Sequence, residues 1–77
     1  MLPTPLKKFF WDAKFDTIDR EANKSYIISR LLEMGDEIAV KWLEQAYSLE
    51  DLINVVKSAR SLSSKSRNYW KLRYLIT

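Results

Sequence analysis

The sequence predicts an all-α fold: a compact domain of about four helices. Apolar residues recur at spacings of three and four over much of residues 19–75, which is the period of an amphipathic helix. No stretch alternates apolar and polar residues for long enough to indicate a strand. A chain of 77 residues has room for one core only. We therefore expect a single domain over residues 1–77, with its helical core in residues 19–77.

The first 18 residues are rich in aromatic side chains but lack a clean helical period. Their two prolines favour an extended start, because proline fixes its own backbone and restricts the residue before it. We expect residues 1–18 to form an extended, irregular aromatic strap packed across the helices. If Phe9, Phe10 and Trp11 formed an exposed patch there, it would be a protein-binding site.

Two helices are expected in the first half of the core. The first begins near Asp19, which can cap a free N–H of the first turn, and ends at Gly35, the only glycine of the chain. Asp36 follows and is expected to cap a second helix that runs to about Tyr47. The predicted inner faces consist of Ile27, Ile28, Leu31, Leu32 and Met34 in the first helix and Ala39, Trp42, Leu43 and Ala46 in the second.

A third and a fourth helix follow. Ser48 is expected to begin the third, in a capping-box pattern with Asp51 in place of the usual glutamate. The run Ser61-Leu62-Ser63 predicts a break, and the fourth helix is expected from about Ser64 to Leu75. The predicted buried stripe of the third helix is Leu49, Leu52, Ile53, Val56 and Ala59, and that of the fourth is Tyr69, Leu72 and Ile76, widened by Trp70 and Tyr74.

The composition argues against catalysis. The chain has no histidine, no cysteine and a single glycine, which removes the commonest general base, the thiol nucleophile and the glycine-rich phosphate loops. Asp12, Asp16 and Asp19 lie close together, but they lack the glycine and the final glutamate of a calcium loop, so helix capping and turns explain them better. We expect a protein that is not an enzyme and that has no metal site and no cofactor.

The sequence also predicts a cytoplasmic protein that does not enter a membrane. No apolar run approaches the roughly 18 residues of a membrane-spanning helix. The first residues lack the apolar stretch of a signal peptide.

Charge is distributed unevenly along the chain. Residues 12–51 hold all ten acidic residues and five basic ones, whereas residues 52–77 hold six basic residues and no acidic one. Such asymmetry favours contact with nucleic acid or with an acidic protein. The alternative is that these cations only complement helix dipoles and keep the surface hydrated.

The polar face of the fourth helix is the candidate binding site. Arginine, asparagine and lysine are the side chains that read base edges and hold phosphates, and a short turn between two helices resembles a helix-turn-helix. The turn lacks the usual glycine, and Arg67 lies near a position where that motif buries an aliphatic side chain. The candidate residues are Lys57, Arg60, Ser64, Lys65, Arg67, Asn68 and Lys71. Two partners stay open: DNA, or an acidic or apolar surface of a larger protein.

Several segments together resemble a family of uncharacterised small bacterial proteins. They are Phe10-Trp11-Asp12, Ile18-Asp19, Tyr26-Ile27-Ile28, Gly35-Asp36, Trp42-Leu43, and the run from Ser58 to Ser63 that leads to Asn68-Tyr69-Trp70. The family pattern reads FWD, FII, GD and WL, and closes with S-R-x-L-S-x-K-T-A-N-F-W. This resemblance implies an antitoxin-like or regulatory role, with genes for nucleotidyltransferase-type toxins as neighbours. Ser66 and Arg67 depart from the Thr-Ala of the pattern, and Ala59 interrupts its paired arginines.

Overall fold

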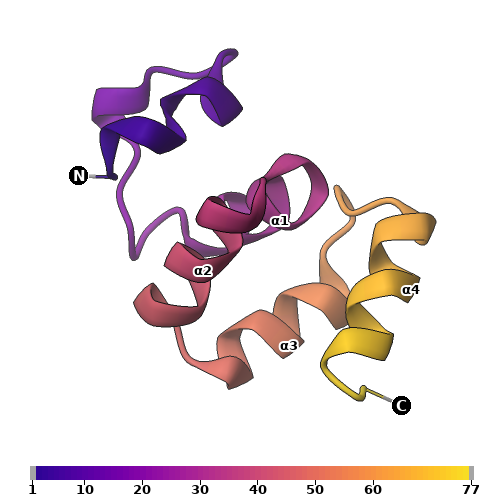
Figure 1. The fold of residues 1–77 in the computed structure, drawn as a ribbon. Coiled ribbons are helices and arrows are strands. Elements are labelled where there is room, and N and C mark those ends of the chain that lie inside the picture. The colour runs from indigo at the N-terminus through magenta and orange to yellow at the C-terminus, as the bar shows by residue number, and fades with distance from the viewer. Residues whose placement is uncertain (1, 77) are drawn as a thin grey trace.

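The computed structural model describes residues 2–76 and confirms the all-α prediction (Figure 1). Two short 3-10 helices come first and four α-helices follow. Their bounds are η1 Thr4–Phe10, η2 Phe15–Thr17, α1 Lys24–Met34, α2 Glu37–Ala46, α3 Leu49–Ser58 and α4 Ser64–Arg73. The helix α1 lies in the middle and contacts η1, α2, α3 and α4. Over residues 2–76, no helix is long and apolar enough to cross a membrane.

The central helix α1 is covered on nearly all sides. Ile27, Ile28 and Leu31 are completely buried, as expected for a helix enclosed by its neighbours. The Ser29 hydroxyl is buried too, but it donates to the Tyr26 carbonyl and accepts a hydrogen bond from Ser61. Met34 was predicted to face the core and is 45% exposed. That prediction is wrong because Met34 is the last residue of the helix and lies beyond the cover of the core.

The start of α1 lies later than the sequence predicted. Asp19 does act as a cap, but its carboxylate accepts from the N–H of Ala22 at 2.6 Å. A turn therefore forms over residues 20–23, and α1 begins only at Lys24. The Asn23 side chain closes this turn by accepting from the N–H of Asp19 at 2.8 Å.

Gly35 joins α1 to α2 by close approach and not by a left-handed backbone. Its φ of −71° is available to any residue. A Cβ at this position would lie 2.4 Å from the Leu31 carbonyl oxygen and 3.1 Å from the Ala39 Cβ, so no larger residue fits here without movement of the backbone. The predicted cap of α2 is confirmed, since the Asp36 carboxylate accepts from the N–H of Ala39 at 2.9 Å.

The N-terminal strap is part of the core and is not extended, which corrects the prediction. Pro5 lies in the first turn of η1, where its fixed φ favours a helical start. Phe10 is 1% exposed and packs against Phe15 and Tyr26, with ring centroids 6.1 and 5.8 Å away. The expected patch is therefore wrong at Phe10, while Phe9 is partly buried and Trp11 is 77% exposed. Other core residues from the strap are Leu2, Leu6 and Ile18.

The helices α2 and α3 largely follow the sequence prediction. Leu43 and Val56 are buried on their inner faces, and the Ser48 hydroxyl caps α3 by accepting from the N–H of Asp51. Leu49 was predicted to be buried and is 57% exposed, because the first turn of α3 projects past the core. Val55 takes a buried position instead.

Burial of Phe10 beside exposed Trp11 gives a direct test of the strap. We expect Phe10→Ala to lower the free energy of unfolding by about 3–5 kcal/mol, because it removes a large side chain from a closed core. Trp11→Ala is the matched control, and we expect it to change stability by less than about 0.5 kcal/mol. Urea unfolding followed by circular dichroism measures both. Equal effects of the two substitutions would contradict a strap that completes the core.

Candidate functional site

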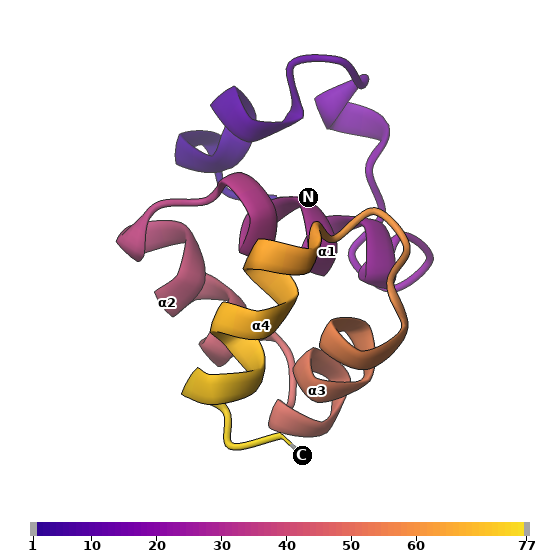
Figure 2. The same cartoon turned by 90° about the vertical axis from the view of Figure 1, so that its right-hand side faces the viewer.

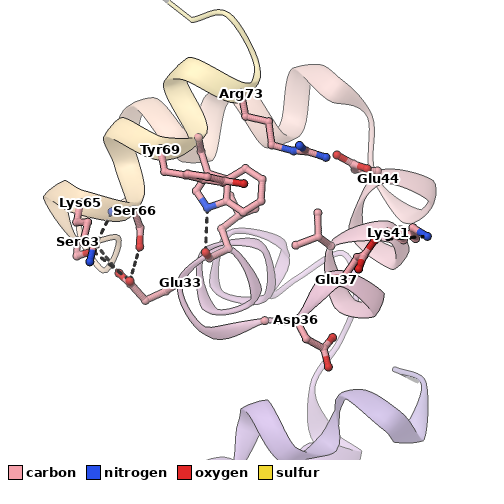
Figure 3. A pocket seen from close by; sticks show the side chains of 14 residues that line it. Glu33, Asp36, Glu37, Lys41, Glu44, Ser63, Lys65, Ser66, Tyr69 and Arg73 are labelled. Carbon is pink, nitrogen blue, oxygen red and sulfur yellow. Dashed lines mark hydrogen bonds and ion pairs between the residues drawn. The ribbon is translucent and has the colours of Figure 1, made fainter.

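One carboxylate on α1 holds the N-terminal end of α4. Glu33 accepts from the Ser63 N–H at 2.6 Å, from the Ser63 hydroxyl at 3.1 Å and from the Ser66 hydroxyl (Figure 3). The Ser63 hydroxyl in turn caps α4 by accepting from the N–H of Ser66. The hydrogen bonds from Ser66 and from the Ser63 backbone lower the pKa of Glu33 below its usual value near 4.5. Glu33 therefore stays ionised and ties α4 to α1.

Trp70 determines which side of α4 faces the core. Its ring is 7% exposed, and its indole N–H donates to the Leu32 carbonyl of α1 at 2.9 Å. Tyr74 stacks on it with ring centroids 5.5 Å apart. A buried tryptophan that also satisfies its one polar group is a strong anchor. The buried side of α4 therefore runs through Trp70 and the half-buried Ser66, Arg67 and Tyr74.

Arg67 is the second anchor, and the prediction that it lies on the outer face is wrong. Its guanidinium donates to the carbonyls of Val56 at 2.7 Å, Ala59, and Leu62 at 3.5 Å. These carbonyls belong to the last turn of α3 and the segment that follows, where no further helical N–H is available to pair with them. A cation there also complements the negative end of the α3 dipole. Arg67 thus joins α3 to α4 and is not free to contact a ligand.

The predicted inner face of α4 is also incorrect in part. Tyr69 is 57% exposed and Leu72 is 79% exposed, whereas both were expected in the core. Two groups of apolar residues on α4 could each have formed its buried side: Tyr69 with Leu72, and Trp70 with Tyr74. The second is buried because its two large rings pack together and the indole finds a carbonyl on α1. Tyr69 and Leu72 are therefore exposed apolar residues, although the sequence predicted them in the core.

Six of the seven candidate residues remain on the surface around α3 and α4. Lys57 and Arg60 are exposed at the end of α3 and in the turn after it, Lys71 is partly exposed on α4, and the others are exposed along α4. We call this set the C-terminal basic surface: Lys57, Arg60, Ser64, Lys65, Asn68 and Lys71. None of its four cations forms a salt bridge among residues 2–76, whereas in the first 41 residues Lys8, Lys24, Arg30 and Lys41 each pair with a carboxylate.

A groove of about 810 Å³ runs between α2 and α4 (Figure 3). Glu37 and Glu44 of α2 lie along one wall, and Lys65 and Arg73 of α4 lie along the other. The hydroxyl of Tyr74 donates to Glu44 at 2.9 Å. Burial of the hydroxyl is the main cause that raises the pKa of Tyr74 well above its usual range, and the Glu44 carboxylate raises it further. The α2 wall also holds Lys41, so its net charge is negative, whereas the net charge of the α4 wall is positive.

Two of the three aspartates near the strap, Asp12 and Asp19, have structural partners. Asp12 pairs with Arg30 at 2.9 Å, and this hydrogen bond lowers the pKa of Asp12 and raises the pKa of Arg30. Asp19 caps the turn before α1. No group of three carboxylate, histidine or cysteine side chains suited to a metal ion occurs within residues 2–76.

Fold and surface together describe a small all-α protein whose outermost helix presents unpaired cations beside apolar side chains. The model of a protein family of unknown function, DUF6922, matches residues 6–56. The match covers most of the strap, all of α1 and α2 and most of α3, and the chain belongs to this family. No curated protein matches the chain. No solved structure matches it either.

The internal role of Arg67 predicts a loss of stability on substitution. We expect Arg67→Ala to lower the free energy of unfolding by about 1.5–3 kcal/mol, the usual contribution of hydrogen bonds from a charged donor. Arg67→Lys restores the charge but not the planar fork of donors, so we expect only partial recovery. Asn68→Ala, one residue further on the exposed side, is the control and should be close to neutral. Chemical unfolding of the three variants at pH 7 measures this, and a neutral Arg67→Ala would contradict the assignment.

The lowered pKa of Glu33 predicts a dependence of stability on pH. A carboxylate whose pKa is lower in the folded state stabilises the fold above its unfolded pKa near 4.5, and this contribution is lost as pH falls through the folded pKa. We expect the free energy of unfolding to decrease between about pH 5 and pH 3. Glu33→Gln should be less stable at pH 7 and should show a shallower decrease. Urea titrations at several pH values test this, and parallel pH profiles for the two proteins would refute it.

Proposed function

We propose that the chain is a non-enzymatic DNA-binding regulator that contacts DNA through the C-terminal basic surface. One observation supports this most directly: residues 52–77 hold six cations and no acid, and the cations of the C-terminal basic surface have no ion-pair partner among the described residues. Unpaired surface cations release counterions when they neutralise phosphates, which favours binding to a polyanion.

The arrangement of α3, the turn and α4 supports the proposal further. The N-terminal half of α4 presents Ser64, Lys65 and Asn68 outward, as a helix that enters a major groove must do. An asparagine amide can bond adenine and a lysine can bond guanine. Lys57 and Arg60 flank this helix end at positions suited to phosphate contacts.

Glu33 limits how α4 can meet DNA. Its carboxylate occupies the first turn of the helix through Ser63 and Ser66, so the positive end of the helix dipole is already compensated. In this proposal phosphates are held by lysine and arginine side chains and not by the helix end. The biological role proposed with it is that of an antitoxin-like regulator of its own operon.

The experiment is fluorescence anisotropy of labelled duplex DNA at about 50 and 200 mM salt. We expect affinity to fall steeply with salt. Lys57→Ala with Arg60→Ala should weaken binding and reduce the slope of log affinity against log salt by roughly 1.8, about 0.9 for each lost phosphate contact. Lys7→Ala with Lys14→Ala removes the same charge from the strap, which Figure 1 places away from α4, and should leave the slope nearly unchanged.

Two results would contradict DNA binding by this surface. The first is no binding at the lower salt concentration. The second is an equal loss in both double variants, which would show that only net charge matters. Circular dichroism of each variant confirms that the fold is retained.

A further inference from the structure

An apolar ridge runs along the outer side of α4 and the residues that follow it. It consists of Tyr69, Leu72 and Leu75, which are 57%, 79% and 88% exposed. Tyr69 and Leu72 are three residues apart in α4, so they lie on one side of the helix, and Leu75 follows just beyond its last turn. Figure 2 shows α4 in front of the other helices on this side of the molecule, with no element over it. Contiguous exposed apolar side chains of this size mark binding surfaces in small proteins.

The ridge is held in place and cannot turn into the core. The indole of Trp70 bonds α1 on the opposite side of α4, and the guanidinium of Arg67 bonds α3. Rotation of α4 that buried Leu72 would break both contacts. The three side chains are therefore presented to solvent in a fixed arrangement, which lowers the entropy cost of binding a partner.

The backbone of Leu75 fixes where this residue lies at the end of α4. Its φ of 55° lies in the left-handed region that glycine normally occupies. The N–H groups of Ile76 and Leu75 bond the carbonyls of Lys71 and Leu72, as in the helix ending that usually has glycine at this position. Leu75 is strained and gains almost no burial in return. The helix ending therefore holds the Leu75 side chain out in solvent beside the last turn of α4.

Charge around the ridge selects the partner. Lys65 and Arg73 each lie four residues from Tyr69 in α4, and Lys71 directly precedes Leu72. No acidic residue follows Asp51 in the chain. A second copy that docked its own ridge here would bring like charges together. A copy that docked its α2, where Ile38 is exposed beside Glu37, would make a head-to-tail contact, which builds a ring or a filament and not a two-fold dimer.

We propose that the ridge binds an acidic amphipathic helix of a partner protein. The apolar stripe of that helix would pack on Tyr69, Leu72 and Leu75, and its acidic flanks would face the surrounding lysine and arginine side chains. Helices that pack an apolar stripe into a complementary surface are a common mode of recognition. The proposal goes beyond DNA binding and does not depend on it. Lys65 and Lys71 belong both to the C-terminal basic surface and to the flanks of the ridge, but Lys57 and Arg60 lie outside α4 and test DNA binding separately.

The test is selection from a displayed library of helical peptides with randomised surface positions, using the full chain as the target. We expect enriched peptides to carry apolar residues at spacings of three and four flanked by aspartate or glutamate. In anisotropy measurements with a labelled enriched peptide, Leu72→Ser with Leu75→Ser should weaken binding at least tenfold, as for the central residues of an interface. Ile38→Ser is the control, since it removes another exposed apolar side chain, and it should have no effect.

Three results would overturn the proposal. They are the absence of enriched peptides, enrichment of basic peptides, and binding that survives Leu72→Ser with Leu75→Ser. Analytical ultracentrifugation tests the second-copy alternative: a dimer that dissociates in the same double variant would assign the ridge to self-association. The DNA-binding double variant Lys57→Ala with Arg60→Ala should keep its affinity for the peptide within about threefold, so the two proposals fail separately.

Discussion

The rotation of α4 about its own axis determines which chemistry this protein presents to its surroundings. Trp70 fixes that rotation from one side by its bond to a carbonyl of α1, and Arg67 fixes it from another by its bonds to the end of α3. Both contacts join a side chain to backbone atoms, so they depend little on the exact shape of neighbouring side chains. With α4 held this way, cations and apolar residues share its outer face while its aromatic anchors stay inside.

The second constraint is size. A chain of 77 residues without cysteine has to stabilise its fold by packing alone. The strap meets this need by placing Phe10 and Leu6, each almost fully buried, against α1. Without the strap, one side of the central helix would be open to water. The segment that looked irregular in the sequence therefore supplies a substantial part of the core.

The sequence predicted helix caps correctly, but it did not predict contacts between residues far apart in the chain. The caps Asp36 and Ser48 depend on residues three positions away, so they could be predicted from the sequence. The rotation of α4 about its axis could not be predicted, because its two groups of apolar residues differ only in the contacts that other helices make with them. The spacing of Tyr69 and Leu72 predicted a buried stripe, but it contains no information on the Leu32 carbonyl that receives the Trp70 indole. For the same reason Arg67 was predicted as a surface residue although it bonds the end of α3.

The two sides of α4 differ in how a substitution affects the protein. Its inner side secures the fold, while side chains such as Asn68 and Leu72 project away from it. Substitutions at such outward positions change the exposed surface at little cost to stability. The family match ends at residue 56, before this helix begins. Single substitutions on the outer side of α4 therefore reshape the exposed surface of this chain and leave its core, most of which lies within the matched residues, intact.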